Sequence, residues 1–260
     1  MKIIELKETF TASNDRDAEE LRAYLKEKSV ILFNLMSAPG SGKTTLLSRI
    51  ITDLRGKASI AVMEADIASA VDAERIEALG AQAVQVHTDG MCHMDAGMTR
   101  EGLLPMDLSG VDMIFLENVG NLICPAEYDT GAVKNIMILS VPEGDDKPLK
   151  YPLMFRESDA LVITKTDALP YFNFDMEKAM ERALRLNPDI KIFPVSAKKG
   201  DGMAALEDWL LEETRQFINQ LTFAEHILED LEVSRRQVSQ GKVRNMAEAL
   251  EDLRKRHGFI

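Results

Sequence analysis

Short apolar runs alternate with amphipathic stretches along most of the chain. Residues 30–36 and 112–116 are almost continuous apolar runs of strand length, without the polar alternation of a half-exposed strand. Similar runs occupy residues 58–63, 83–87, 135–141, 160–164 and 191–195. Helices are predicted at residues 44–54, 69–79, 95–104 and 203–217. Because strands buried on both faces are typical of parallel sheets, we expect an α/β fold with a mostly parallel sheet flanked by helices on both faces.

The two ends of the chain differ from this central pattern. Residues 15–28 carry Leu21, Tyr24 and Leu25 at helical spacing, which predicts a short surface helix. After about residue 221 the chain is rich in Glu, Arg, Lys and Gln with spaced Leu, Ile and Val, and it is expected to form amphipathic helices broken near Gly241. This extension is either a helical cap or a partner-binding or dimerising arm. The expected division is 1–29, a helical segment; 30–220, the main domain; and 221–260, a C-terminal helical extension.

The segment from Ser37 to Thr45 reads Ser-Ala-Pro-Gly-Ser-Gly-Lys-Thr-Thr, between a predicted strand and a predicted helix. It matches the phosphate-loop pattern G-x-x-x-x-G-K-[ST], with Ser37 at the first glycine position. In such a P-loop NTPase, backbone N–H groups and the helix N-terminus bind phosphates, and Lys43 reaches the β- and γ-phosphates. The Thr44 hydroxyl is expected to bind Mg²⁺. The predicted phosphate-binding residues are Pro39, Gly40, Ser41, Gly42, Lys43, Thr44 and Thr45.

Two further strand ends carry acidic residues that such a site needs. Asp66 ends the second predicted strand, and Glu117 ends a later one. A phosphate-loop enzyme requires a carboxylate near Mg²⁺ and a group that orients the attacking water. Asp66 and Glu117 are therefore the candidate magnesium and catalytic residues, together with Lys43. The alternative is that these acids cap helices or face solvent.

A candidate base-recognition element follows the strand at residues 160–164. Lys165 and Asp167 there resemble the N-K-x-D element of GTPases, with Thr164 in the Asn position, a change expected to weaken one supporting contact. An Asp carboxylate can accept from guanine N1–H and the 2-amino group together, which adenine does not offer. After the next strand, the sequence resembles the S-A-K element of GTPases at Ser196, Ala197 and Lys198. Guanine is therefore the expected base.

Both cysteines of the chain lie in loops after predicted strands. Cys92 is followed directly by His93, and Cys124 lies in the loop after the strand that ends at Glu117. Thiolate and imidazole are suited to Zn²⁺, Ni²⁺ or Cu rather than to Mg²⁺ or Ca²⁺. Three ligands are evident, so a complete shell would need a second subunit. The alternative is that both cysteines are small apolar fillers and His93 is a polar loop residue.

Composition narrows the classes of partner. The net charge of −12 argues against broad binding to nucleic acid or to anionic membranes, because both need clustered Lys and Arg. The first twenty residues are too polar for a signal peptide, and no run of 18 apolar residues predicts a membrane span. Two cysteines do not make a secreted disulfide scaffold, so a reducing cytoplasm is the expected location.

Four motifs together are similar to those of the hydrogenase nickel-incorporation GTPases, the HypB family of SIMIBI-class P-loop GTPases. They are the phosphate loop and the segments that begin at Met91, at Glu117 and at Glu143, over roughly residues 30–215. The resemblance implies a GTPase that forms a homodimer when GTP is bound and helps deliver nickel to [NiFe]-hydrogenase. It implies partners among the hydrogenase maturation accessory proteins and the hydrogenase large subunit. It also implies GTP or GDP and Mg²⁺ as ligands.

The resemblance further implies that Cys92, His93 and Cys124 form a nickel or zinc site at the dimer interface. It suggests that Lys147 or Lys150 reaches toward the nucleotide of the second copy. The N-terminal Cys-rich or His-rich tracts of some family members are missing here, so nickel storage is not expected.

Alternative functions remain open from the residues alone. They are a nickel GTPase serving urease, a P-loop metallochaperone for another client, a metal carrier or scaffold with structural nucleotide, and an ATP-dependent kinase.

Overall fold

A computed structural model describes residues 6–66, 71–239 and 246–257 of the chain. The chain divides into two compact units, Met1–Phe217 and Ile218–Ile260. Within the described ranges, no helix combines the length and the apolar character needed to cross a membrane. The predicted break near Gly241 lies outside the described residues.

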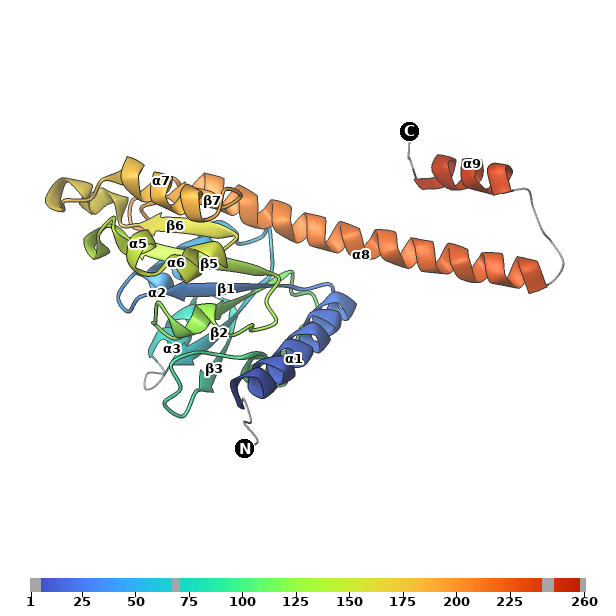
Figure 1. Cartoon of the computed structure of the whole chain (residues 1–260), viewed down its shortest axis with the longest axis horizontal. Helices are drawn as coiled ribbons and strands as arrows, with labels where there is room; N and C mark the ends of the chain where they lie inside the picture. Colours follow the sequence, from blue (N-terminus) through green and yellow to red (C-terminus); the bar gives the residue numbers. More distant parts are fainter. Residues whose placement is uncertain (1–5, 67–70, 240–245, 258–260) are drawn as a thin grey trace, which may run out of the picture. The chain divides into compact units, whose positions relative to one another are not determined.

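A parallel β-sheet forms the centre of the first unit (Figure 1). Its seven strands have the order β3-β2-β4-β1-β5-β6-β7, and each strand pair in the described chain is parallel. The strands are β1 (Ile31–Ser37), β2 (Ile60–Asp66), β3 (Gln82–His87), β4 (Met113–Glu117), β5 (Lys134–Ser140), β6 (Ala160–Thr164) and β7 (Lys191–Pro194). The predicted α/β fold with a mostly parallel sheet is confirmed.

Helices connect the strands and form both ends of the described chain. The α-helices are α1 (Leu6–Lys28), α2 (Lys43–Asp53), α3 (Val71–Ala78), α4 (Ala96–Leu103), α5 (Lys147–Lys150), α6 (Pro152–Arg156), α7 (Met176–Leu186), α8 (Met203–Ser239) and α9 (Met246–His257). Short 3₁₀ helices are η1 (Cys124–Ala126), η2 (Val141–Glu143) and η3 (Thr166–Tyr171). Because parallel strands need crossovers, helical connections of this kind follow from the sheet itself.

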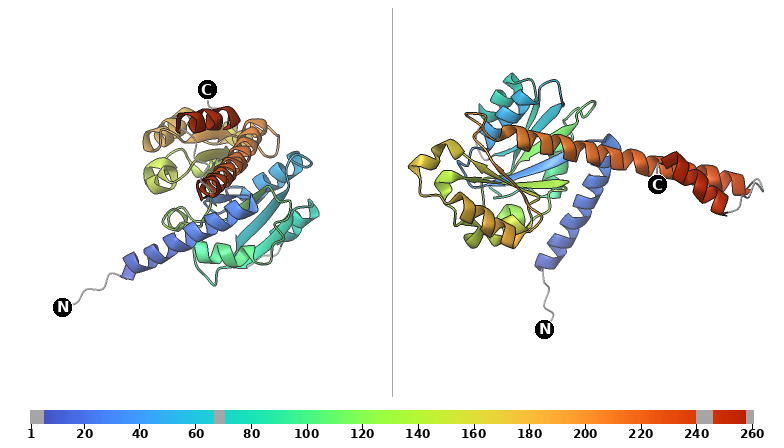
Figure 2. Two further views of the ribbon diagram at one scale, coloured as in Figure 1. Left: turned by 90° about the vertical axis from the view of Figure 1, so that its right-hand side faces the viewer. Right: turned by 90° about the horizontal axis from the view of Figure 1, so that it is seen from above.

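The central strands β1 and β4 bury both of their faces, as their sequences predict. On one face, Leu32 and Ile114 pack in a core cluster that also holds Leu21 and Leu25 of α1. On the other face, the ring of Phe33 stacks on that of Phe115 and also contacts the ring of Trp209 in the first turns of α8. Figure 2 shows α1 and α5–α7 on one side of the sheet and α2 and α3 on the other. Helices on both faces leave the strand ends as the place for loops with polar functions.

Two predicted helices differ from those observed. The N-terminal helix begins at Leu6 rather than near residue 15, and its Leu21 and Leu25 are fully buried rather than at the surface. Helix α8 runs without interruption from Met203 to Ser239, where the pattern predicted a boundary near residue 221. Both errors follow from reading local periodicity alone, since packing decides where a helix is buried and polar residues of high helix propensity extend it.

Candidate nucleotide and metal sites

The phosphate loop connects the end of β1 to the start of α2. Gly40 and Gly42 have φ values of +73° and +96°, in the left-handed region that favours glycine. Gly42 is the residue before the first helical position, Lys43, so the backbone turns directly into the N-terminus of α2. A helix N-terminus presents unpaired N–H groups and positive potential to an anion. The local backbone therefore has the form that the motif predicts.

Ser37 is the motif position that departs from glycine, and it is fully buried. Its hydroxyl oxygen accepts from Ser41 Oγ at 2.7 Å and from Lys43 Nζ at 2.9 Å, and it donates to the Ala38 carbonyl at 2.9 Å. The serine thus orients the ammonium group that is expected to bind phosphate. The sequence motif did not predict this role, because it treats the position as a turn.

Glu117 and Thr44 are brought together at the same sheet edge. Thr44 Oγ1 donates to Glu117 Oε1 at 3.2 Å. A hydroxyl and a carboxylate oxygen at this distance are the donor types that Mg²⁺ prefers. Asp66 is the last residue of β2 and pairs in register with His87, but its side chain lies outside the described residues.

A carboxylate that the sequence argument passed over lies beside Glu117. Glu64 of β2 is the register partner of Glu117 in β4, and only 3% of it is exposed. Side chains of register partners on adjacent parallel strands project from the same face of a sheet. The sequence offered one signal for this residue, because a glutamate inside an apolar run, two residues before Asp66, is unusual in a buried strand. Glu64 is thus a further acidic group at this edge.

The predicted base-recognition residues adjoin the phosphate loop. Thr164 Oγ1 donates to the Ser41 carbonyl at 2.7 Å, and Lys165 Nζ donates to the Gly40 carbonyl at 2.6 Å. The Lys165 side chain also lies over Gly42, where an added Cβ would be 3.5 Å from Lys165 Cε. Threonine in the Asn position therefore still makes a buried contact with the phosphate loop.

Asp167 is fixed by the following strand connection. Ser196 Oγ donates to Asp167 Oδ1 at 2.7 Å and in turn accepts from the backbone N–H of Lys199 at 3.2 Å. The hydrogen bond from Ser196 is the main reason that the pKa of Asp167 lies below its usual value, and the charges of Lys199 and Lys198 act in the same direction. The structure thus joins the two elements predicted to recognise guanine through Ser196 and Asp167, and the carbonyl of Ala197, the next residue, accepts from Arg49 Nη1 at 3.4 Å.

The two cysteines and His93 meet although they come from separate loops. One ligand atom from each of Cys92, His93 and Cys124 lies within 4.8 Å of the others. The two Sγ atoms are 2.9 Å apart, and Cys92 Sγ is 3.8 Å from His93 Nδ1. Both cysteines reach solvent, whereas His93 is buried. Two thiols and one imidazole form a partial shell for a soft divalent cation.

An aromatic ring holds the imidazole in place. The rings of His93 and Tyr128 are stacked, with centroids 3.8 Å apart and an angle of 14° between their planes. Burial lowers the pKa of His93, against the opposing charges of Asp95 and Glu127. A neutral imidazole is the form that binds a metal ion. Sequence reasoning missed Tyr128, because nothing in the local pattern relates it to His93.

One loop contacts both the phosphate loop and the metal-binding loop. After Glu117, the buried Asn118 accepts from the backbone N–H of Met94 at 3.1 Å, next to His93. Gly120 packs against the phosphate loop, where an added Cβ would lie 3.0 Å from Pro39. The same segment continues to Cys124. The nucleotide and metal residues are therefore joined by a short, well-packed connection.

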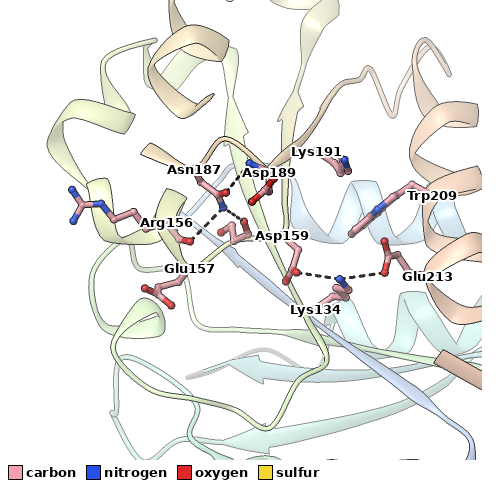
Figure 3. A pocket seen from close by; sticks show the side chains of 10 residues that line it. Lys134, Arg156, Glu157, Asp159, Asn187, Asp189, Lys191, Trp209 and Glu213 are labelled. Atoms are coloured by element: carbon pink, nitrogen blue, oxygen red, sulfur yellow. Dashed lines mark hydrogen bonds and ion pairs between the residues drawn. The ribbon is translucent and has the colours of Figure 1, made fainter. Parts of the chain in front are cut away.

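A separate pocket of about 380 Å³ lies at the opposite edge of the sheet (Figure 3). It is lined by residues at the starts of β5, β6 and β7, among them Lys134, Asp159 and Lys191. Lys134 lies 3.2 Å from both Asp159 and Glu213, so its charge is balanced within the fold. None of the predicted site residues lines this pocket. Ligands of parallel sheets bind beyond the carboxyl ends of the strands, so the nucleotide site is elsewhere.

Together, the parallel sheet, the phosphate loop and the base-recognition elements define a P-loop nucleotide-binding protein. The CobW/HypB/UreG nucleotide-binding domain family matches residues 31–194 of the chain. The chain therefore belongs to the CobW/HypB/UreG family, and within it to the HypB proteins.

Three relatives illustrate this similarity. The chain is 44% identical over 209 residues to the hydrogenase maturation factor HypB of Azotobacter vinelandii, covering 80% of this chain and 69% of that protein. It is 40% identical over 221 residues to the hydrogenase/urease maturation factor HypB of Helicobacter hepaticus, covering 83% of this chain and 90% of that protein. The chain is also similar to the crystal structure of HypB from Helicobacter pylori in complex with nickel. The sequence identity is 38% and the TM-score is 0.76, over 78% of this chain and 96% of that chain.

Proposed function

We propose that the chain is a cytoplasmic, GTP-hydrolysing metallochaperone that helps to insert nickel during [NiFe]-hydrogenase maturation. The observation that carries this proposal is the meeting of Cys92, His93 and Cys124 within 4.8 Å, on loops joined to the nucleotide residues. The names of the relatives support hydrogenase as the client. The nickel complex of the Helicobacter pylori protein supports nickel as the cargo.

In this proposal the phosphate loop binds GTP and the chain hydrolyses it to GDP and phosphate. Lys43 and the backbone amides of the loop bind the phosphate oxygens, while Asp167 accepts hydrogen bonds from guanine. Thr44 and Glu117 offer oxygens that would hold Mg²⁺, which supplies charge neutralisation at the phosphates. Asp66, for which only the backbone is described, stays a proposed magnesium and catalytic residue.

A homodimer completes the proposed metal site. The three donors of one chain leave a four-coordinate shell incomplete, and a second copy could supply further thiol or imidazole donors. Nickel and zinc both accept these donors. Lys147, which lies over the ring of Tyr151, and Lys150, paired with Asp146 at 2.5 Å, are the proposed residues that reach the second nucleotide. The cargo then passes to an accessory protein and the hydrogenase large subunit.

Hydrolysis would change metal affinity through the loop from Glu117 to Cys124. The γ-phosphate orders the loop at Glu117 and Gly120, and the change reaches Met94 through Asn118. Thermodynamic linkage then requires that metal binding alter nucleotide affinity by the same factor.

The test is a metal titration of the purified chain with GDP and with a non-hydrolysable GTP analogue, with oligomer size measured on the same samples. We expect Ni²⁺ affinities that differ by roughly fivefold or more and a dimer only with the analogue. Cys92→Ser serves as the control, since it should lose metal binding in both states and keep nucleotide binding. Equal affinities would remove the coupling from the proposal.

A second client deserves a test because the Helicobacter hepaticus relative carries both hydrogenase and urease in its name. Complementation of a strain without its own HypB, with hydrogenase and urease activities both measured, separates the two clients. The same assay with Lys43→Ala separates a GTPase from a metal carrier whose nucleotide is structural. Nickel transfer that continues unchanged in that variant would favour the carrier.

A further inference from the structure

Helix α1 joins the two loops that carry the metal donors. Asn14 Nδ2 donates to the carbonyl of Asp129 at 2.9 Å, and Asn14 Oδ1 accepts from the backbone N–H of Ala96 at 3.0 Å. Ala96 begins α4 directly after the Cys92–His93 loop, and Asp129 follows Tyr128 in the loop of Cys124. A single side chain thus connects both loops through backbone groups, which a change of neighbouring side chains would not remove.

A second contact fixes the same loop to the same helix. Arg22 donates from Nη1 and Nη2 to the two carboxylate oxygens of Asp129, at 2.9 and 2.8 Å. Paired bonds between a guanidinium and a carboxylate fix orientation as well as distance. Two residues further, a Cβ on Gly131 would lie 2.6 Å from Leu21 Cδ2, so the loop backbone is pressed against α1.

These contacts act on the metal donors through very short lengths of chain. Asp129 is adjacent to Tyr128, whose ring stacks on His93. Ala96 is anchored beside Asp95, which caps α4 by accepting from the N–H of Met98 at 2.8 Å. Fixing both loops to one helix therefore sets the separation of the imidazole and the two thiols. Without it, binding a cation would include the entropic cost of ordering two loops.

We propose that α1 is a brace for the metal site, with Asn14 and Arg22 as positioning residues that hold Cys92, His93 and Cys124 in a geometry suited to a soft divalent cation. The inference rests on the proposed function, since it assumes that these three residues bind the cargo. It adds a role for the N-terminal helix that no nucleotide or metal motif contains. The phosphate loop and the guanine-recognition residues lie on other loops, so we expect the brace to act on the metal donors and to leave the GDP affinity of the metal-free chain unchanged.

The first test titrates Ni²⁺ into the full chain and into Asn14→Ala and Arg22→Gln, with the thiolate-to-nickel absorption as the readout. We expect each variant to lose about tenfold in affinity, the scale found for groups that orient metal ligands, and to show a shifted absorption band. GDP affinity should stay unchanged. Arg16→Ala is the matched control, because the exposed Arg16 on the same helix donates to the Ala12 carbonyl of its own turn.

The second test needs no metal. Diamide oxidises two thiols to a disulfide, so that one S–S bond forms while the two electrons and two protons pass to the reagent and give a hydrazine. With the Sγ atoms of Cys92 and Cys124 at 2.9 Å, the wild-type chain should form this bond rapidly. Asn14→Ala and Arg22→Gln should form it several-fold more slowly, whereas Arg16→Ala should match the wild type.

The outcomes separate this proposal from the proposed function. If the wild-type chain binds Ni²⁺ and Cys92→Ser does not, the metal site is established. The brace is then overturned if Asn14→Ala and Arg22→Gln both match the wild type in Ni²⁺ affinity, absorption band and rate of disulfide formation. If wild type itself binds no Ni²⁺ or Zn²⁺, the proposed function fails and the brace fails with it.

Discussion

Lys43 is a nearly buried ammonium group, with 9% of the residue exposed. A buried charge needs partners, and the Ser37 hydroxyl is one of them at 2.9 Å. The hydroxyl also accepts from Ser41, so the serine organises the loop around the lysine before any phosphate is bound. This arrangement explains why the motif tolerates a side chain at its first position here.

Removing that hydroxyl should therefore destabilise the nucleotide-free chain. We expect Ser37→Ala to lower the free energy of unfolding by about 1.5–3 kcal/mol, the range for a lost hydrogen bond to a charged group. Urea denaturation without nucleotide measures it. Ser48→Ala is the control, since the buried Ser48 hydroxyl has no hydrogen-bond partner and its loss should cost little. Equal stability of the Ser37 and Ser48 variants would contradict the assigned role.

Asp167 shows the effect of a single hydrogen bond on a titration. Ser196 holds its pKa below the usual value, so the carboxylate stays ionised to a lower pH than in the unfolded chain. A carboxyl group with a lowered folded pKa stabilises the fold above its unfolded pKa, and that contribution is lost as the pH falls through the folded pKa. The stability that Asp167 contributes is therefore lost at pH values on the acid side of the ordinary Asp range.

Ser196→Ala should raise the pKa of Asp167 toward its ordinary value, because the first and largest cause of the shift is removed. Carboxyl-carbon NMR of the wild-type and variant chains, followed through the acid range, gives both values. GDP binding should also begin to fail at a higher pH in the variant, since only the ionised carboxylate pairs with guanine. An unchanged Asp167 titration would show that Ser196 does not set it.

At the scale of elements, the segment between β4 and η1 connects the two sites. Asn118 Nδ2 donates to Asn34 Oδ1 at 3.1 Å, and Asn34 Nδ2 donates to Asn135 Oδ1 at 3.0 Å, so a chain of amides crosses from this segment to β1 and β5. At its other end, Asn118 Oδ1 accepts from the N–H of Met94 and of Val119. The segment is therefore anchored to the sheet while contacting the metal loop.

Asn118→Ala should uncouple the sites as well as destabilise the chain. Two backbone N–H groups lose an acceptor, which costs about 1–3 kcal/mol in unfolding free energy. The ratio of Ni²⁺ affinities between the GTP-analogue and GDP states should fall toward one. Asn135→Ala is the comparison, because it shortens the amide chain far from Met94 and should keep the ratio. If the ratio of Ni²⁺ affinities in Asn118→Ala equals that of the wild type, this residue does not take part in the coupling.

The elements also show where sequence patterns are informative. The central strands β1, β4, β5 and β6 were predictable because they are apolar on both faces, which a covered parallel sheet explains. The start of α1 was not predictable, because residues 6–14 hold few large apolar residues and several residues of low helix propensity. The continuity of α8 through residue 221 was missed for a similar reason, since a change of composition is not a helix boundary.

At the scale of the whole molecule, some residues of the candidate site could be predicted from the sequence and others could not. The phosphate loop, Lys165 and Asp167 follow from motifs whose order along the chain is fixed by the sheet. The meeting of Cys92 with Cys124, 32 residues apart, was suggested by a family resemblance and not by spacing. Tyr128, Asn118 and Asn14 could not be predicted, because their roles depend on packing between segments distant in sequence.

The two-unit organisation allows a final prediction. All the predicted site residues, the described core clusters and the proposed brace lie within Met1–Phe217. A chain that ends after Phe217 should therefore fold, bind GDP and bind Ni²⁺ as the full chain does, because a domain needs its own core to be stable and this unit has one. Thermal unfolding, GDP titration and Ni²⁺ titration of the shortened chain measure this.

The same shortened chain decides between the two interpretations of the C-terminal extension. Oligomer size with the GTP analogue should change if residues 218–260 are a dimerising arm, whereas a helical cap should affect unfolding temperature and leave the dimer intact. Since the metal donors lie in the first unit and the proposed dimer closes around them, we expect the dimer to persist. Loss of GDP binding on truncation would contradict the independence of the first unit, and loss of the dimer alone would assign self-association to the extension.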